Sequence, residues 1–220
     1  MPLTAQTKVA DVVTTHPECA SVLQSHRIDF CCKGELSLEE ACRRRGLEPG
    51  EVLAELERTV AARALAITDV RATPTPELIE LIVERHHGYL RQALPFLTTI
   101  SAKVARVHGQ GEPRLVEIDQ IVRPLAEQLI AHLDQEEAEL FPAMLDGEPS
   151  PEALAEGLRA DHEWIGEQIG RLRTLSDEYT PPEWACRSYS TLFAELEALE
   201  TDVLRHVHLE NHVLFPRFTS

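Results

Sequence analysis

The sequence carries one pattern twice, as His132-Leu-Asp-Gln-Glu136-Glu-Ala-Glu-Leu-Phe141-Pro142 and as His206-Val-His-Leu-Glu210-Asn-His-Val-Leu-Phe215-Pro216. Both copies have the form H-x3-E-x4-F-P. A single histidine precedes each copy at nearly the same distance, since His87 lies 45 residues before His132 and His162 lies 44 residues before His206. The repetition predicts two helical hairpins, each with one histidine on its first helix and a histidine–glutamate pair on its second.

The residue types in this repeat are those of a metal site. Side chains four residues apart on an α-helix share one face, with their Cβ atoms about 5 to 6 Å apart. One such pair alone is more often a solvated pair on a helix surface, but two copies with matching partner histidines favour ligands. Four imidazoles and two carboxylates exceed what one tetrahedral zinc needs and suit a pair of iron ions. The candidate ligands are His87, His132, Glu136, His162, His206 and Glu210.

The spacing of apolar residues predicts an all-α fold. Apolar side chains recur at helical spacing through the long segments between the Gly and Pro clusters. Four longer helices are expected at residues 76–107, 114–141, 151–177 and 182–214, and their short connections favour an up-down-up-down four-helix bundle. Pro95 and Pro124 fall inside the first two helices, where we expect a kink or a break.

The first third of the chain predicts shorter helices, at residues 7–16, 17–26, 37–45 and 49–66. Ser37 is the expected N-cap of the third, with Glu40 completing a capping box. The stretch from Thr68 to Pro76 contains two prolines and is the expected linker. We therefore predict a small helical Cys-Cys domain at residues 1–68 and a four-helix bundle at residues 75–220.

Composition limits the classes of partner. The chain has 21 Lys and Arg against 37 Asp and Glu, a net charge of −16, which repels nucleic acids and anionic lipids. The sequence has no apolar run of membrane-spanning length, and its first residues have no apolar core of signal-peptide length, so we expect neither a membrane span nor a signal peptide. An odd number of cysteines without framework spacing argues against a secreted disulfide scaffold, so we expect a cytoplasmic protein. The five are Cys19, Cys31, Cys32, Cys42 and Cys186.

Two further stretches, Lys103-Val-Ala-Arg-Val-His108-Gly and Asp29-Phe-Cys31-Cys32-Lys-Gly, accompany the six candidate ligands. Together these residues resemble the iron–sulfur cluster repair di-iron proteins over nearly the whole chain. The resemblance implies a hemerythrin-like bundle after a small Cys-Cys domain. It also implies two non-heme iron ions with oxo and carboxylate bridges, in a cytoplasmic protein.

The same resemblance implies a stress-response role, the repair of iron–sulfur clusters damaged by nitric oxide or peroxide. Iron donation and reduction of nitric oxide are the activities it suggests. The implied partners are damaged iron–sulfur proteins, nitric oxide or oxygen as a small ligand, and an external electron donor. Whether the chain forms a homodimer stays open.

Two other functions remain as alternatives. The first is a hemerythrin-like sensor or carrier that binds oxygen or nitric oxide without repair activity. Oxygen-carrying hemerythrins are similar but use five histidines and two carboxylates, whereas the final motif here supplies Glu210. The second is an interaction module in which the N-terminal domain matters more than the metals. The Cys-Cys module favours repair over a carrier.

The remaining histidines need separate interpretations. His86 stands where the family commonly has a tyrosine, and the register of the following leucines selects His87 as the ligand. His108 falls at a helix end, where a structural role competes with one of supporting the metal ligands. His208 and His212 point to other sides of their helix than His206, and we expect both at the surface.

The adjacent thiols Cys31 and Cys32 have two interpretations. Free cysteines are often simply buried, and neighbours make a strained disulfide. The family resemblance implies instead a redox or nitrosothiol-forming pair, or an intermolecular contact. Lys33 and Arg27 are close in sequence and would favour the thiolate form.

Overall fold

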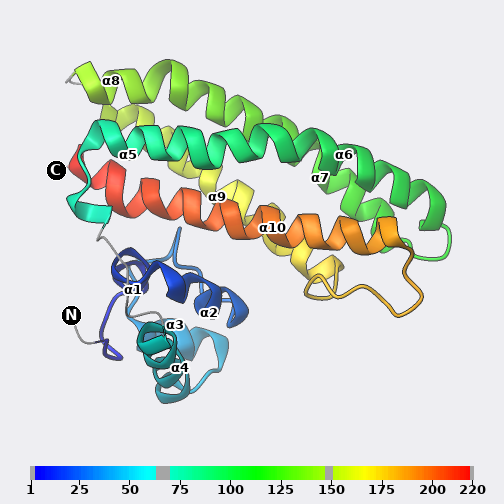
Figure 1. The fold of residues 1–220 in the computed structure, drawn as a ribbon, viewed down its shortest axis with the longest axis horizontal. Helices are drawn as coiled ribbons and strands as arrows, with labels where there is room; N and C mark the ends of the chain where they lie inside the picture. The colour runs from blue at the N-terminus through cyan, green and yellow to red at the C-terminus, as the bar shows by residue number, and fades with distance from the viewer. Residues whose placement is uncertain (1–2, 63–69, 147–150, 219–220) are drawn as a thin grey trace. The chain divides into compact units, whose positions relative to one another are not determined.

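The computed structural model describes residues 3–62, 70–146 and 151–218. Those residues are almost entirely helical, and the β-pairing among them is a single bridge between Lys8 and Ser37. The predicted all-α class is confirmed (Figure 1). The chain divides into two compact units, one joining Met1–Ile79 with Leu204–Ser220 and the other spanning Glu80–Val203. The last helical turns of the chain therefore group with the N-terminal helices.

The N-terminal helices are short, as the sequence predicts. They are α1 (Val9–Thr15), α2 (Ala20–Ser25), which follows a 3₁₀ turn at Pro17–Cys19, α3 (Leu38–Arg45) and α4 (Pro49–Ala62). Ser37 caps α3, because its side chain accepts a hydrogen bond from the Glu40 N–H at 3.2 Å. Gly46 ends α3 with φ of 69°, a left-handed conformation that glycine adopts without steric cost. The predicted continuation of α4 to residue 66 and the start of the linker at Thr68 lie outside the described residues.

The unit Glu80–Val203 contains the long helices of the bundle. These are α6 (Gly88–His108), α7 (Arg114–Gln135), α9 (Pro151–Leu175) and most of α10 (Arg187–Leu209), with α5 (Thr75–Ile82) leading into α6 and α8 (Phe141–Asp146) following α7. The long helices run alongside one another in alternating directions (Figure 1). Their inward faces are apolar, and the fully buried side chains include Leu90, Leu97, Ile118, Leu129 and Phe193.

Of the kink or break expected at Pro95 and Pro124, a break does not occur, because each proline lies inside a continuous helix. Each proline leaves the carbonyl four residues earlier without its helical donor. Both prolines are exposed, and water can satisfy those carbonyls without any interruption of the helix.

Among the described residues, three wider π-helical turns interrupt the helices instead. They are Val83–His87, Glu136–Leu140 and Glu210–Leu214. In each, a backbone N–H bonds the carbonyl five residues earlier: Gly88 to Val83, Phe141 to Glu136, and Phe215 to Glu210. A proline ring clashes with the carbonyl four residues before it in a regular α-helix, so the F-P step favours a wider preceding turn. Each π-turn begins or ends at a candidate ligand, and such turns are frequent at functional sites.

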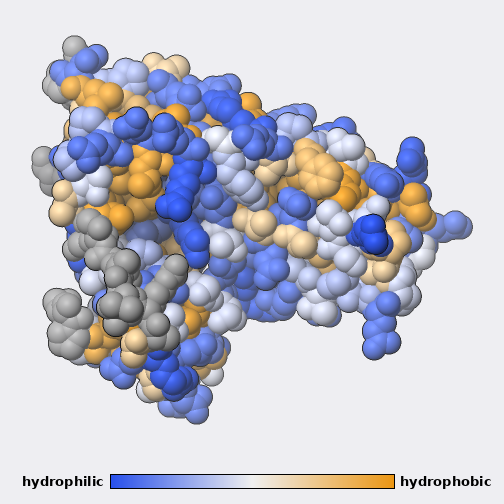
Figure 2. All heavy atoms as spheres, viewed as in Figure 1, coloured by the Kyte–Doolittle hydropathy of each residue, from blue (hydrophilic) through white to orange (hydrophobic). Residues whose placement is uncertain are grey.

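The surface is mainly polar. Hydrophilic residues cover much of the face drawn in Figure 2, with smaller apolar areas between them. Within the described residues, no helix combines the length and the hydropathy that a membrane span requires.

Candidate metal centre

Glu136 is the centre of a buried cluster in the unit Glu80–Val203. Its carboxylate is fully buried at the start of the second π-turn. Nε2 of His87 lies 3.4 Å from Oε2 of Glu136, and Nε2 of His132 lies 3.3 Å from Oε1. The two ring nitrogens therefore approach the carboxylate from two different helices.

His162 of α9 completes this cluster. Its Nε2 atom lies 3.0 Å from Nε2 of His132, and the rings meet edge to face. The ligand atoms of His132, Glu136 and His162 all lie within 4.8 Å of one another. Two imidazole nitrogens bound at a right angle to one ion, at about 2.1 Å each, are about 3.0 Å apart. The observed spacing therefore suits two nitrogens that share one metal ion.

In two of these rings, the Nδ1 atom contacts a carboxylate oxygen. Nδ1 of His87 lies 2.8 Å from Oε1 of Glu137, which also accepts a hydrogen bond from Arg91 at 3.0 Å. Nδ1 of His132 lies 3.3 Å from Oδ2 of Asp161. Metal-binding histidines commonly donate their second N–H to a carboxylate, which fixes the ring and directs the other nitrogen to the metal.

The charge on Glu137 is consistent with this arrangement. Burial alone would raise the pKa of its carboxyl group. The hydrogen bonds from His87 and Arg91 outweigh burial and lower that pKa below its usual range. Glu137 is therefore an anion that can hold His87 in the tautomer with Nε2 available to a metal.

The second copy of the motif lies in the other unit, within Leu204–Ser220. Nε2 of His206 lies 2.9 Å from Oε1 of Glu210, and both side chains are buried. Glu210 begins the third π-turn as Glu136 begins the second. The two copies of H-x3-E-x4-F-P therefore have the same local structure.

The donor set fits metal binding. All six predicted ligands are at most 2% exposed. Two buried carboxylates are costly unless cations or hydrogen bonds compensate them, and bound divalent ions supply that charge. Imidazole and carboxylate donors together suit iron.

The structure separates His86 from His87. His86 is also buried, but its Nδ1 atom lies 2.9 Å from Oδ1 of Asp202. His87 is the one whose ring faces Glu136. The sequence makes Glu137, Asp161 and Asp202 candidates for supporting the metal ligands or for iron transit, with a solvated helix face as the simpler explanation. In the structure each of them contacts a histidine ring.

His108 does not support the candidate ligands. It ends α6, whose 21 residues from Gly88 correspond to about 30 Å along a helix, so His108 is far from His87. Its Nε2 atom lies 3.2 Å from the Cys186 thiol, and its ring packs near Trp184 and Tyr189. These contacts support the structural role for His108 at the helix end.

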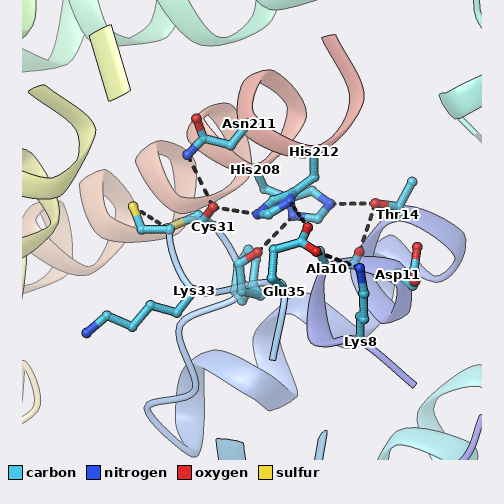
Figure 3. Close-up of polar contacts among 12 residues, drawn as sticks. Lys8, Ala10, Asp11, Thr14, Cys31, Lys33, Glu35, His208, Asn211 and His212 are labelled. Atoms are coloured by element: carbon cyan, nitrogen blue, oxygen red, sulfur yellow. Dashed lines mark hydrogen bonds and ion pairs between the residues drawn. The ribbon is translucent and has the colours of Figure 1, made fainter. Parts of the chain in front are cut away.

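The expectation that His208 and His212 lie at the surface is wrong. His208 is 2% exposed, with Nδ1 donating to the Phe30 carbonyl at 3.2 Å and Nε2 lying 2.9 Å from Oγ1 of Thr14. Burial lowers the pKa of His208 to about 4. His212 donates from Nε2 to the Cys31 carbonyl at 2.6 Å (Figure 3). Thr14, Phe30 and Cys31 from the N-terminal part of the chain therefore contact His208 and His212 on this helix.

The expected thiolate form of the cysteine pair is also wrong for Cys31. A hydrogen bond with Cys32, burial and the nearby Asp29 carboxylate together raise the pKa of the Cys31 thiol well above its ordinary value. Lys33 extends its amine away from Cys31 (Figure 3). None of the five cysteines, all within the described residues, forms a disulfide.

The helical bundle and its buried histidines and glutamates define a hemerythrin-like class of cation-binding domain. Residues 79–218 match the family model described as the hemerythrin HHE cation binding domain. Residues 5–60 match ScdA_N, a domain of unknown function (DUF542).

Similar proteins match over nearly the full length. One, named iron-sulfur cluster repair protein ScdA, from Staphylococcus haemolyticus, is 31% identical over 99% of this chain and 100% of its own. Another, named iron-sulfur cluster repair protein YtfE, from Yersinia pseudotuberculosis, is 31% identical over 91% of each chain. The chain belongs to this family of iron–sulfur cluster repair proteins, and the resemblance predicted from its motifs is confirmed.

Proposed function

We propose that this chain is a non-heme di-iron protein that repairs iron–sulfur clusters damaged by nitrosative or oxidative stress. The observation that carries the proposal is the buried Glu136 carboxylate, which Nε2 atoms of His87 and His132 face while carboxylates hold the opposite ring nitrogens. The names of relatives that match nearly the whole chain support the repair role.

Both glutamates would bridge the two irons. The six ligands would then serve as two equivalent sets that share Glu136 and Glu210, as the duplicated motif suggests. Each set has two imidazoles and two carboxylates. The domain match across residues 79–218 includes all six side chains, and the matching π-turns support equivalent roles for the two glutamates.

The bound irons would supply redox chemistry and open coordination positions for a small ligand such as nitric oxide or oxygen. Glu136 and Glu210 can bind through one or both oxygens and so follow a change in metal charge. Phe141 is buried and its ring stacks on that of His87, with the ring centroids 5.7 Å apart. Reduction of two nitric oxide molecules to nitrous oxide and water consumes two electrons and two protons, so turnover needs an external electron donor. Iron donation needs a damaged iron–sulfur protein as partner.

The test of repair uses the full chain loaded with ferrous iron without oxygen. It is mixed with an iron–sulfur dehydratase whose cluster nitric oxide has destroyed, and the recovered dehydratase activity is followed. Recovery should exceed that given by the same amount of free ferrous iron with a thiol reductant. A chain with Glu136→Gln and Glu210→Gln should give no more than free iron, and circular dichroism checks that it is folded.

Equal recovery with the wild-type chain and the double variant would contradict the proposal. Nitric oxide consumption and nitrous oxide formation, measured on the same samples, separate nitric oxide reduction from iron donation. If nitric oxide changes the absorption spectrum of the iron-loaded chain but neither dehydratase activity recovers nor nitric oxide is consumed, the result would instead support the sensor or carrier function.

A further inference from the structure

The loop from Asp29 to Lys33 is wound around one carboxylate. Oδ1 of Asp29 accepts backbone N–H bonds from Cys31 at 3.1 Å, Cys32 at 2.8 Å and Lys33 at 3.4 Å. Three donors on one oxygen fix both the carboxylate and the backbone that carries the thiols. Hydrogen bonds from the loop backbone to Asp29 therefore fix the geometry of this loop.

We propose that Asp29, Cys31 and Cys32 form a second metal site, which takes a thiophilic divalent cation, zinc or ferrous iron. Their donor atoms all lie within 4.8 Å of one another. Thiolate ligands select such ions, whereas the His/Glu ligands described above contain no sulfur. The site is distinct from the di-iron ligands and does not depend on the proposed repair role.

The spacing of the donors matches a tetrahedral ion. The two Sγ atoms are 3.6 Å apart, and Sγ of Cys31 is 3.2 Å from Oδ1 of Asp29. Metal–sulfur bonds of about 2.3 Å at the tetrahedral angle place two sulfurs about 3.8 Å apart. A metal–oxygen bond of about 2.1 Å places the oxygen about 3.6 Å from each sulfur. The sulfur–sulfur distance and the distance from the Cys31 sulfur to the carboxylate oxygen thus each lie within a few tenths of an ångström of the values for one ion.

Two residues near the C-terminus donate hydrogen bonds to the backbone of this loop. Asn211 donates to the Cys31 carbonyl at 3.2 Å, and His212 donates to the same oxygen at 2.6 Å (Figure 3). Gly34 permits the close approach, since a Cβ there would lie 2.6 Å from Nε2 of His212 and from the Phe30 carbonyl. Such supporting contacts keep metal ligands oriented, and here they fix the backbone of Cys31 without using its sulfur.

Partial exposure gives a cation access to the site. Cys31 is buried, whereas Cys32 is half-buried. The raised pKa of Cys31 means that its thiol keeps its proton in the metal-free loop. Binding of a cation by the Cys31 sulfur therefore releases the proton of that thiol to solvent. Three protein donors leave a fourth tetrahedral position open.

Cobalt(II) is the probe, because thiolate ligation gives intense near-ultraviolet charge-transfer absorption that imidazole and carboxylate ligation do not. The metal-free full chain is titrated with Co²⁺ under reducing conditions without oxygen. We expect the thiolate band to appear, and Cys31→Ser and Cys32→Ser each to abolish or strongly reduce it. Cys186→Ser is the matched control, since it removes an exposed thiol elsewhere and should leave the band unchanged.

The outcomes separate this site from the di-iron centre. Glu136→Ala should leave the thiolate band intact. Zn²⁺ should displace the cobalt readily, and Fe²⁺ should displace it only in excess. Absence of the band at saturating Co²⁺, its persistence in the double serine variant, or failure of both ions to displace cobalt would overturn the proposal. Near-unchanged melting temperatures of the serine variants show that loss of the band does not reflect unfolding. The proposed function predicts no change in His/Glu iron binding in any of these serine variants.

Discussion

Nε2 of His212 donates a hydrogen bond of 2.6 Å to the carbonyl oxygen of Cys31, 181 residues away in sequence. The two residues join the thiol loop to the π-turn that begins at Glu210. His212 lies in the second H-x3-E-x4-F-P motif, so one short helical segment carries both a candidate iron ligand and the contact that holds the cysteine pair (Figure 3). The N-terminal and C-terminal parts of the chain therefore form one structural unit here.

Gly34 is predicted to be essential for this contact. A Cβ at this position would lie 2.6 Å from Ala10 Cβ, His212 Nε2 and the Phe30 carbonyl, and the backbone oxygen cannot easily move. Gly34→Ala should lower the free energy of unfolding by about 1–3 kcal/mol. Chemical denaturation measures the change.

Gly170→Ala is the control for that substitution. Gly170 is exposed on α9, and no atom lies within 4 Å of the position that a Cβ would take there. Alanine should therefore stabilise the helix by about 0.5–1 kcal/mol. Equal effects of the two substitutions would show that the close approach at Gly34 is unimportant.

Glu137 is predicted to strengthen iron binding without being a ligand. Its hydrogen bond to Nδ1 of His87 should orient the ring. Glu137→Ala should therefore weaken ferrous iron binding about 10–100-fold, and Glu137→Gln should weaken it less. Competition with a chelator measures the affinity. Glu139→Ala, two residues away and exposed, should bind iron as the wild type does, and an unchanged affinity for Glu137→Ala would refute the positioning role.

Arg173 and Glu200 form a buried ion pair between α9 and α10. Nη2 of Arg173 lies 2.8 Å from Oε2 of Glu200, and the side chains are 12% and 7% exposed. Arg173→Met leaves the Glu200 charge without this partner and should cost about 3–5 kcal/mol of stability. The double variant with Glu200→Leu should be more stable than Arg173→Met alone. Strictly additive losses in denaturation would contradict the coupling.

Cys19 is predicted to make stability depend on alkaline pH. Burial, assisted by Glu18, raises the pKa of this thiol from 9.0 to about 12. Above pH 9 the unfolded chain loses a proton that the folded chain keeps, so stability falls as pH rises from 9 towards 12. Between pH 8 and pH 10 the loss should be about 1 kcal/mol. Cys19→Ala should flatten this part of the profile, and the same slope in both proteins would disprove the assignment.

The ligand motif and the bundle could be predicted because both follow from helical periodicity. Apolar spacing marked the long helices, and the duplicated H-x3-E pattern marked Glu136 and the rings that face it. The π-turns could not be read from periodicity, although the F-P step at Phe141 is a local signal for one of them. The prolines did not break their helices because they face solvent.

The environment of His208 and the cysteine pair depends on tertiary contacts. Helical spacing shows that His208 points away from His206, but it does not show what covers that side. Phe30 and Thr14, nearly two hundred residues earlier, cover it. Sequence neighbours likewise suggested that Lys33 favours a Cys31 thiolate, whereas the hydrogen bond with Cys32, burial and the charge of Asp29 raise the pKa of this thiol.

The proposed function requires that two irons share Glu136 and Glu210. Its most direct test is the number of ferrous ions bound per chain in an anaerobic titration, made in a protein with Cys31→Ser and Cys32→Ser so that only His and Glu ligands contribute. We predict two ions per chain, and the loss of both when Glu136→Ala is added. Binding of a single ion, or loss of only one in the Glu136→Ala protein, would contradict the shared site.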